Sequence, residues 1–123
     1  MDEKICLDSD FIIELINKKE KANDLFEKYY RLDTYTTTIN IFELLQRVEK
    51  IEDVESFLNK VNVLDFDEKS ARLASETHKE LKSKGQILEF RDLFIAAICL
   101  SNNLTLITLN KKHFSRIRNL KII

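Results

Sequence analysis

The stretch KICLDSDFIIELI, residues 4–16, decides how this chain begins to fold. Its first apolar residues predict a short buried strand, and that strand stops abruptly on Asp8. Ser9 and a second acid, Asp10, follow, and either side chain is suited to cap the apolar helix that comes next. The two acids at this junction have two interpretations: an ordinary strand exit with a helix cap, or a site for a metal ion or a phosphate.

Beyond this stretch, short strand-like runs alternate with helical patterns. Strands are predicted at residues 3–7, 34–38, 61–66, 104–108 and 120–123. Helices are predicted from apolar residues at three- and four-residue spacing near residues 11–16, 22–32, 41–48, 54–61, 67–84 and 92–100. A left-handed helix end is expected at Gly85. The alternation predicts an α/β fold in three layers, α/β/α, with a central parallel sheet.

Length and composition limit the class of protein. The 123 residues suit a single domain over residues 1–123, and 44% are hydrophobic, enough for one core. Cys6 and Cys99 lie far apart in apolar runs, so we expect two reduced core cysteines and a cytoplasmic protein. No segment approaches the ~20 apolar residues of a membrane span, and the first residues lack the pattern of a signal peptide.

Charge is distributed unevenly along the chain. All 21 acidic residues lie at or before Asp92, whereas residues 93–123 carry five basic residues and no acidic one. This asymmetry predicts an anionic partner for the C-terminal part, with a solvated surface as the alternative interpretation.

The predicted sheet gives the acids after the first strand a location. In parallel sheets, ligands bind outside the carboxyl ends of the strands, and Asp8, Thr108 and Asn110 all lie at such ends. The strand-DxD pattern is similar to haloacid-dehalogenase phosphatases, but those need an acidic pair late in the chain, and this chain has none. A response-regulator receiver domain stays a weaker alternative, with Asp65 or Asp67 as the phosphorylated residue and no matching lysine on a late strand.

A better resemblance covers nearly the whole chain in order. ICLDSDFIIELI, TTTINIFELL and GQILEFRDLFIAAICLSNNLTLITLNKKHF resemble the three main motifs of PIN-domain ribonucleases, especially the VapC-type toxins of toxin–antitoxin pairs. The last stretch has an Asp seven residues after Gly85, an Ala-Ala apolar helix, a strand, Thr-x-Asn, and a Phe four residues beyond the Asn. Two differences stand out: Ser9-Asp10 replaces the usual Thr-Asn, and the fourth metal position is the neutral Asn110.

The resemblance implies a metal site and a reaction. Asp8, Glu43 and Asp92 would be catalytic carboxylates that bind Mg²⁺ or Mn²⁺ together with Asn110. These hard ions prefer oxygen ligands and generate a nucleophilic hydroxide at a phosphate. Taken singly, each residue also has an ordinary interpretation: a strand exit, an exposed Glu paired with Arg47, a helix first-turn anion and a turn residue.

The same resemblance assigns supporting roles near the site. Lys111, Lys112 and Arg116 follow Asn110 closely and would bind RNA phosphates. Ser9 and Thr108 are candidates for orienting water or phosphate, and Asp10 lies beside them.

The resemblance also implies partners: an RNA substrate, a cognate antitoxin protein and a second copy of the chain. We expect the dimer contact near Phe26, Tyr29 and Tyr30. Two alternatives remain: a catalytically inactive PIN scaffold that binds RNA or protein, and a housekeeping PIN nuclease of RNA processing.

Overall fold

A computed structural model describes residues 3–29 and 33–123 of the chain. Its centre is a five-stranded sheet in which every pairing is parallel, with strand order β3-β2-β1-β4-β5. The strands are β1 Lys4–Leu7, β2 Asp33–Thr37, β3 Asn62–Leu64, β4 Thr105–Ile107 and β5 Lys121–Ile122. This order differs from the 2-1-3-4-5 order of receiver domains, so the receiver alternative is wrong.

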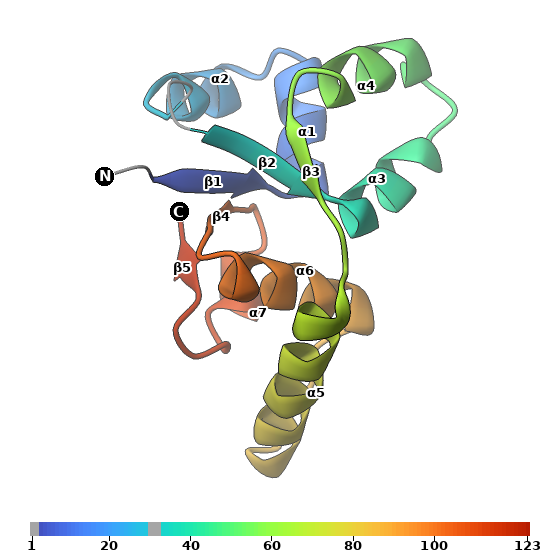
Figure 1. The fold of residues 1–123 in the computed structure, drawn as a ribbon. Coiled ribbons are helices and arrows are strands. Elements are labelled where there is room, and N and C mark those ends of the chain that lie inside the picture. The colour runs from blue at the N-terminus through green and yellow to red at the C-terminus, as the bar shows by residue number, and fades with distance from the viewer. Residues whose placement is uncertain (1–2, 30–32) are drawn as a thin grey trace.

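Helices cover both faces of the sheet, as predicted (Figure 1). Helices α1 Ser9–Ile16, α2 Glu20–Glu27, α3 Thr38–Leu45 and α4 Ile51–Leu58 lie on one side, and α5 Glu68–Ser83, α6 Phe90–Ser101 and α7 Lys111–Phe114 lie on the other. The three-layer α/β/α architecture and the parallel sheet are therefore confirmed.

Strand β1 shows why the sheet needs both layers. Its side chains alternate between faces: Ile5 and Leu7 belong to the core under α1–α4, whereas Cys6 belongs to the core around α6. All three are at most 1% exposed. A strand that is apolar on both faces must be covered on both, which explains the continuous apolar run in the sequence.

Helix α6 is the most deeply buried helix segment of the second layer. Its residues Ile95 to Cys99 are all at most 1% exposed, and they form much of the core on that side of the sheet. The sequence 92–100 therefore forms a helix rather than a strand, as predicted. Cys6 and Cys99 are free and buried, and a hydrogen bond with Cys99, together with burial, raises the pKa of the Cys6 thiol.

Several local predictions need adjustment. Asp8, not Ser9 or Asp10, is the N-cap of α1. Val48 lies beyond the end of α3 and is 90% exposed, so the helix predicted from the apolar stripe over 41–48 is too long at its C-terminal end. The four-residue helix α7 was not predicted. Gly85 has a φ of +70°, which confirms the left-handed helix end.

Two predictions touch residues outside the described ranges. Leu32, at the end of the second predicted helix, and Tyr30, in the predicted dimer contact, lie outside them. The chain from 3–29 and 33–123 contains no helix long and apolar enough to cross a membrane.

Candidate functional site

The site lies where the strand order reverses. Strand β1 is central, with β2 on one side and β4 on the other, so the carboxyl ends of these three strands meet at one edge of the sheet. Each strand is followed by polar residues that are buried: Asp8 after β1, Asn40 in the first turn after β2, and Thr108 after β4. Burying polar side chains costs free energy unless they are hydrogen-bonded, so their partners define the site.

Asp8 is the centre of the hydrogen-bond network. It is 4% exposed, and its carboxylate accepts hydrogen bonds from three donors. The Ser9 amide and the Asn40 Nδ2 donate to Oδ1 at 2.9 and 3.0 Å, and the Thr108 hydroxyl donates to Oδ2 at 2.7 Å. Burial raises the pKa of Asp8; the three hydrogen bonds oppose that rise, and the negative charge of Asp92 adds to it.

Asn40 connects Asp8 to the next helix, and the sequence analysis did not select it. It is fully buried in the first turn of α3 and donates from Nδ2 to the Ser9 hydroxyl at 2.8 Å as well as to Asp8. Its Oδ1 accepts a hydrogen bond of 2.7 Å from Thr37, the N-cap of the helix. The available signal was its position three residues before Glu43, on the same helix face, directly after a strand end.

Glu43 lies one helix turn further along α3 and turns toward the same network. Its side chain is 17% exposed, and Oε1 accepts a hydrogen bond of 2.8 Å from the Ser9 hydroxyl. Its Oε2 is paired with Arg91. Burial raises the pKa of Glu43, hydrogen bonds from Ser9 and Arg91 oppose the rise, and the charge of Asp8 adds to it. The ordinary interpretation of Glu43 as an exposed partner of Arg47 does not describe these contacts.

Asp92 enters the site from the first turn of α6. Its side chain is 4% exposed and accepts a hydrogen bond of 2.9 Å from Arg91 Nη2. Arg91 therefore joins Glu43 to Asp92 through its two terminal nitrogens. Arg91 was not among the predicted site residues, although it lies directly before an acid that begins an apolar helix.

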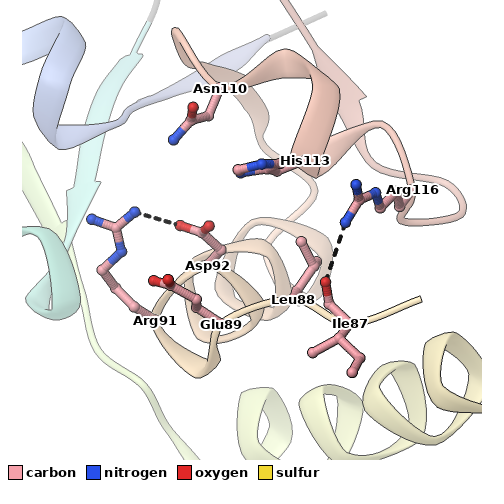
Figure 2. Close-up of a pocket in the computed structure, with 8 residues that line it drawn as sticks. All are labelled: Ile87, Leu88, Glu89, Arg91, Asp92, Asn110, His113 and Arg116. Atoms are coloured by element: carbon pink, nitrogen blue, oxygen red, sulfur yellow. Dashed lines mark hydrogen bonds and ion pairs between the residues drawn. The ribbon is translucent and has the colours of Figure 1, made fainter. Parts of the chain in front are cut away.

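The other wall of the site is formed by the segment after β4. The Asn110 amide donates to the Thr108 hydroxyl at 3.0 Å, and Asn110 is the N-cap residue of α7. Figure 2 shows Asn110 and His113 facing Arg91 and Asp92 across a cavity of about 370 Å³. Arg116 also lines this cavity, and its guanidinium donates to the Ile87 carbonyl at 3.2 Å.

The structure brings some of the sequence-predicted residues together and leaves others apart. Asp8, Ser9, Glu43, Asp92 and Thr108 form one connected network of hydrogen bonds and charges. Lys111 and Lys112 are exposed on α7 and do not line the cavity, whereas Asn110 and Arg116 do. Asp10 is exposed on the first turn of α1. Ser9 and Thr108 both donate to carboxylates, so in this structure they orient the acids.

The chemistry of these donors suits a hard divalent cation. They are carboxylate and amide oxygens, and burial raises the pKa values of two of the carboxylates, so a bound cation would stabilise their charged forms. Within residues 3–29 and 33–123, however, no three His, Cys, Asp or Glu side chains are already arranged to hold a metal ion. Arg91 is the positive group that contacts Glu43 and Asp92 instead.

Comparison with known proteins identifies the family. Residues 5–120 match the PIN domain. The chain therefore belongs to the PIN-domain family, whose expected fold the sheet and layers above reproduce.

Within this family the named relatives are VapC ribonucleases. The chain is 30% identical to the tRNA(fMet)-specific endonuclease VapC of Salmonella typhimurium, over 97% of this chain and 96% of that protein. It is 39% identical to ribonuclease VapC2 of Rickettsia felis over 67 residues, which span 54% of this chain and 50% of that protein.

Solved structures agree with these relatives. The crystal structure of VapBC2 from Rickettsia felis, bound to a DNA fragment from its promoter, superposes with a TM-score of 0.86 at 28% identity and covers 98% of this chain and 97% of that one. The DNA-bound VapBC of Salmonella typhimurium has a TM-score of 0.84 at 26% identity, covering 100% and 98%.

Proposed function

We propose that this chain is a metal-dependent endoribonuclease that hydrolyses RNA phosphodiester bonds, and that it is the toxin of a toxin–antitoxin pair. The observation that carries the proposal is the buried Asp8, held by three donors at the strand-order reversal and coupled to Glu43 and Asp92. Relatives named as VapC ribonucleases and endonucleases support the same substrate class.

In this proposal, one group of residues binds the ion and another group binds the RNA. Asp8, Glu43, Asp92 and Asn110 are the proposed ligands of Mg²⁺ or Mn²⁺, and a bound ion supplies an activated water and neutralises charge on the phosphate. Thr108 and Ser9 fix the orientation of Asp8 and Glu43 through their hydroxyls. Arg116 at the cavity, with Lys111 and Lys112 on the exposed face of α7, provides positive charge for phosphates of the RNA backbone.

The proposed partners follow from the solved relatives. Both are structures of VapBC, and the named relatives of this chain are VapC ribonucleases, so the partner we propose for this chain is a cognate antitoxin protein. We also propose a cytoplasmic location, because an RNA substrate of this kind is found there.

A homodimer also remains a prediction, but its proposed contact needs a different basis. Phe26 and Tyr29 are half-buried and pack into the core under α1–α4, so they do not provide spare aromatic surface. Large apolar side chains are exposed instead at Phe42, Leu45 and Val48, on and just after α3.

The experiment that tests the proposal is RNA cleavage by the purified protein with and without a divalent ion. Cleavage in Mg²⁺ or Mn²⁺ that stops on addition of EDTA and returns with excess ion is expected. The ion should also raise the melting temperature of the RNA-free protein, because it binds the folded state, and this rise should shrink in Asp92→Asn. RNA binding without ion-dependent cleavage would instead identify an inactive scaffold.

A further inference from the structure

Arg91 contacts two of the proposed metal ligands at once. Its Nη1 is paired with Glu43, and its Nη2 donates to Asp92 at 2.9 Å. Arg91 belongs to α6, like Asp92, whereas Glu43 belongs to α3 and lies 48 residues from Arg91 in sequence, so the guanidinium joins the two helices. With Asp8 also close enough to raise the pKa of Glu43, the guanidinium supplies the positive charge that this group of acids requires.

One hydrogen-bond donor of Arg91 lacks a partner among the described residues. Its Nε is buried and has no hydrogen-bond partner in the part of the chain that the structure describes. A buried donor without a partner is costly, so this placement of the side chain is stabilised mainly by the two carboxylates. The side chain as a whole is 37% exposed and lines the cavity of about 370 Å³, which gives the guanidinium room to leave the two carboxylates (Figure 2).

A divalent ion and the guanidinium would bind the same two carboxylates. Both bind Glu43 and Asp92 through carboxylate lone pairs, and two cations at one pair of acids repel each other. Binding of the ion therefore requires Arg91 to give up at least part of its contacts.

We propose that Arg91 is an internal counter-cation that occupies the metal position between Glu43 and Asp92 in the metal-free protein and competes with the divalent ion for these two carboxylates. The proposal rests on the proposed function, since it requires that these acids bind an ion. It makes Arg91 a residue that sets the metal affinity of the site.

The test is calorimetric titration of Mn²⁺ into the RNA-free protein. Arg91→Gln removes the competing cation and should bind Mn²⁺ about tenfold more tightly than the wild type, a change of one decade in the binding constant. Arg91→Lys keeps the charge but not the two-pronged contact, so its affinity should lie between the two. It also keeps the test available if Arg91→Gln folds poorly.

Arg116→Gln is the matched control. Arg116 lines the same cavity, but its guanidinium donates to the Ile87 carbonyl, so it does not neutralise Glu43 or Asp92 through contact. Its loss removes the same charge and should change the Mn²⁺ affinity less than threefold. A tenfold gain in Arg116→Gln as well would mean that overall charge, and not competition by Arg91, sets the affinity, and it would overturn the proposal.

A second measurement separates competition from simple damage to the fold. The melting temperature of the metal-free protein should fall in Arg91→Gln, because two buried acids lose their counter-ion, while the rise produced by Mn²⁺ should become larger. Equal or weaker Mn²⁺ binding by folded Arg91→Gln would overturn the inference alone. Absence of Mn²⁺ binding in both the wild type and the variant would overturn the proposed function.

Discussion

Two regions of this molecule contain ion pairs with similar distances, but the pairs differ in how exposed they are and in what it would cost to break them. On the outer face of α5, Arg72 and Glu68 are 2.9 Å apart, and their side chains are 78% and 81% exposed. At the strand ends, Arg91 and Asp92 are also 2.9 Å apart, but Asp92 is only 4% exposed. Water can solvate an exposed charge that loses its partner, so the free-energy cost is small. A buried acid that loses its partner keeps an uncompensated charge, so the free-energy cost is larger.

Distance alone does not identify a functional charge. The α5 pair follows from helical i, i+4 spacing and belongs to a solvated surface. The strand-end group collects Asp8, Glu43 and Asp92 from three separate segments, and there burial, with a smaller contribution from a neighbouring acid, raises the pKa values of Asp8 and Glu43. A protein keeps such an unfavourable arrangement where the acids have a ligand to bind.

The largest expected effect is loss of RNA cleavage in Asp8→Asn. The amide keeps the size of the side chain, and the Thr108 hydroxyl can reverse its hydrogen bond, so the fold should persist. What the variant loses is a negative charge directed at the ion, and cleavage should fall by at least ~10²-fold. Growth inhibition on expression should disappear with it, while antitoxin binding is retained.

Asp10→Asn is the internal control for that experiment. Asp10 is exposed on the first turn of α1 and lies outside the buried network, so cleavage should be largely kept. If Asp10→Asn is inactive while Asp8→Asn cleaves like the wild type, the site has to be rebuilt around Asp10.

The next effect concerns stability and separates the buried network from the surface. Asn40→Ala leaves the Thr37 hydroxyl without its acceptor and removes one donor each from Asp8 and Ser9. Unfolding by urea should show a loss of about 1–3 kcal/mol, the cost of unsatisfied buried polar groups. Asn62→Ala, at an exposed asparagine that donates to the Thr34 carbonyl on the sheet edge, should change stability by less than about 0.5 kcal/mol. Equal losses of stability in the two variants would mean that the buried network contributes no more to stability than an exposed hydrogen bond.

A smaller effect depends on pH. Because burial raises the pKa of Asp8, this carboxyl stays protonated to a higher pH in the folded protein than in the unfolded chain. Stability is therefore lost as pH rises from the ordinary aspartate pKa of about 3.9 through the folded-state pKa. Asp8→Asn lacks this loss, so the stability of the metal-free variant relative to wild type should increase across that window and stay constant above it. Urea unfolding at a series of pH values measures this, and a difference that does not vary with pH would contradict it.

The smallest effect is expected at α5. Arg72→Ala breaks the exposed pair with Glu68 and should change the free energy of unfolding by no more than about 0.5 kcal/mol, with little effect on cleavage. Thermal unfolding in low and high salt provides the measurement, because any contribution of this pair should decrease as salt screens it. A loss as large as that of Asn40→Ala would show that the contrast between the two regions is wrong.

The sequence predicted the parts of the site that lie directly at element ends. The abrupt stop of an apolar strand on Asp8, and an acid before the apolar helix at Asp92, are local patterns, and the structure places both where expected. The parallel sheet in three layers was predictable from alternating strands and helices. The boundaries of α3 and the cap of α1 were less so, because tertiary contacts decide the last turn of a helix.

The role of Asn40 and Arg91 in the site could not be predicted from the residues next to them in sequence. Asn40 matters because β2 lies beside β1, which places it against Asp8, and that neighbour relation belongs to the sheet order. Arg91 matters because α6 meets α3 near the sheet edge, so that one guanidinium contacts acids of both helices. Each residue alone is typical of an ordinary helix surface, and only the assembled fold shows that it contacts an acid of another segment.

The hydrogen bond between Thr108 and Asp8 joins residues 100 positions apart, and β1 pairs with β4 over the same interval. A chain that is still being synthesised therefore contains β1 and β2 before β4 exists, and at that stage Asp8 lacks its Thr108 donor. Domains generally fold as units, and contacts of long sequence separation slow their folding. The nascent protein accordingly passes through most of its synthesis with an incomplete site, and the centre is assembled only once residue 108 has been added and has folded back.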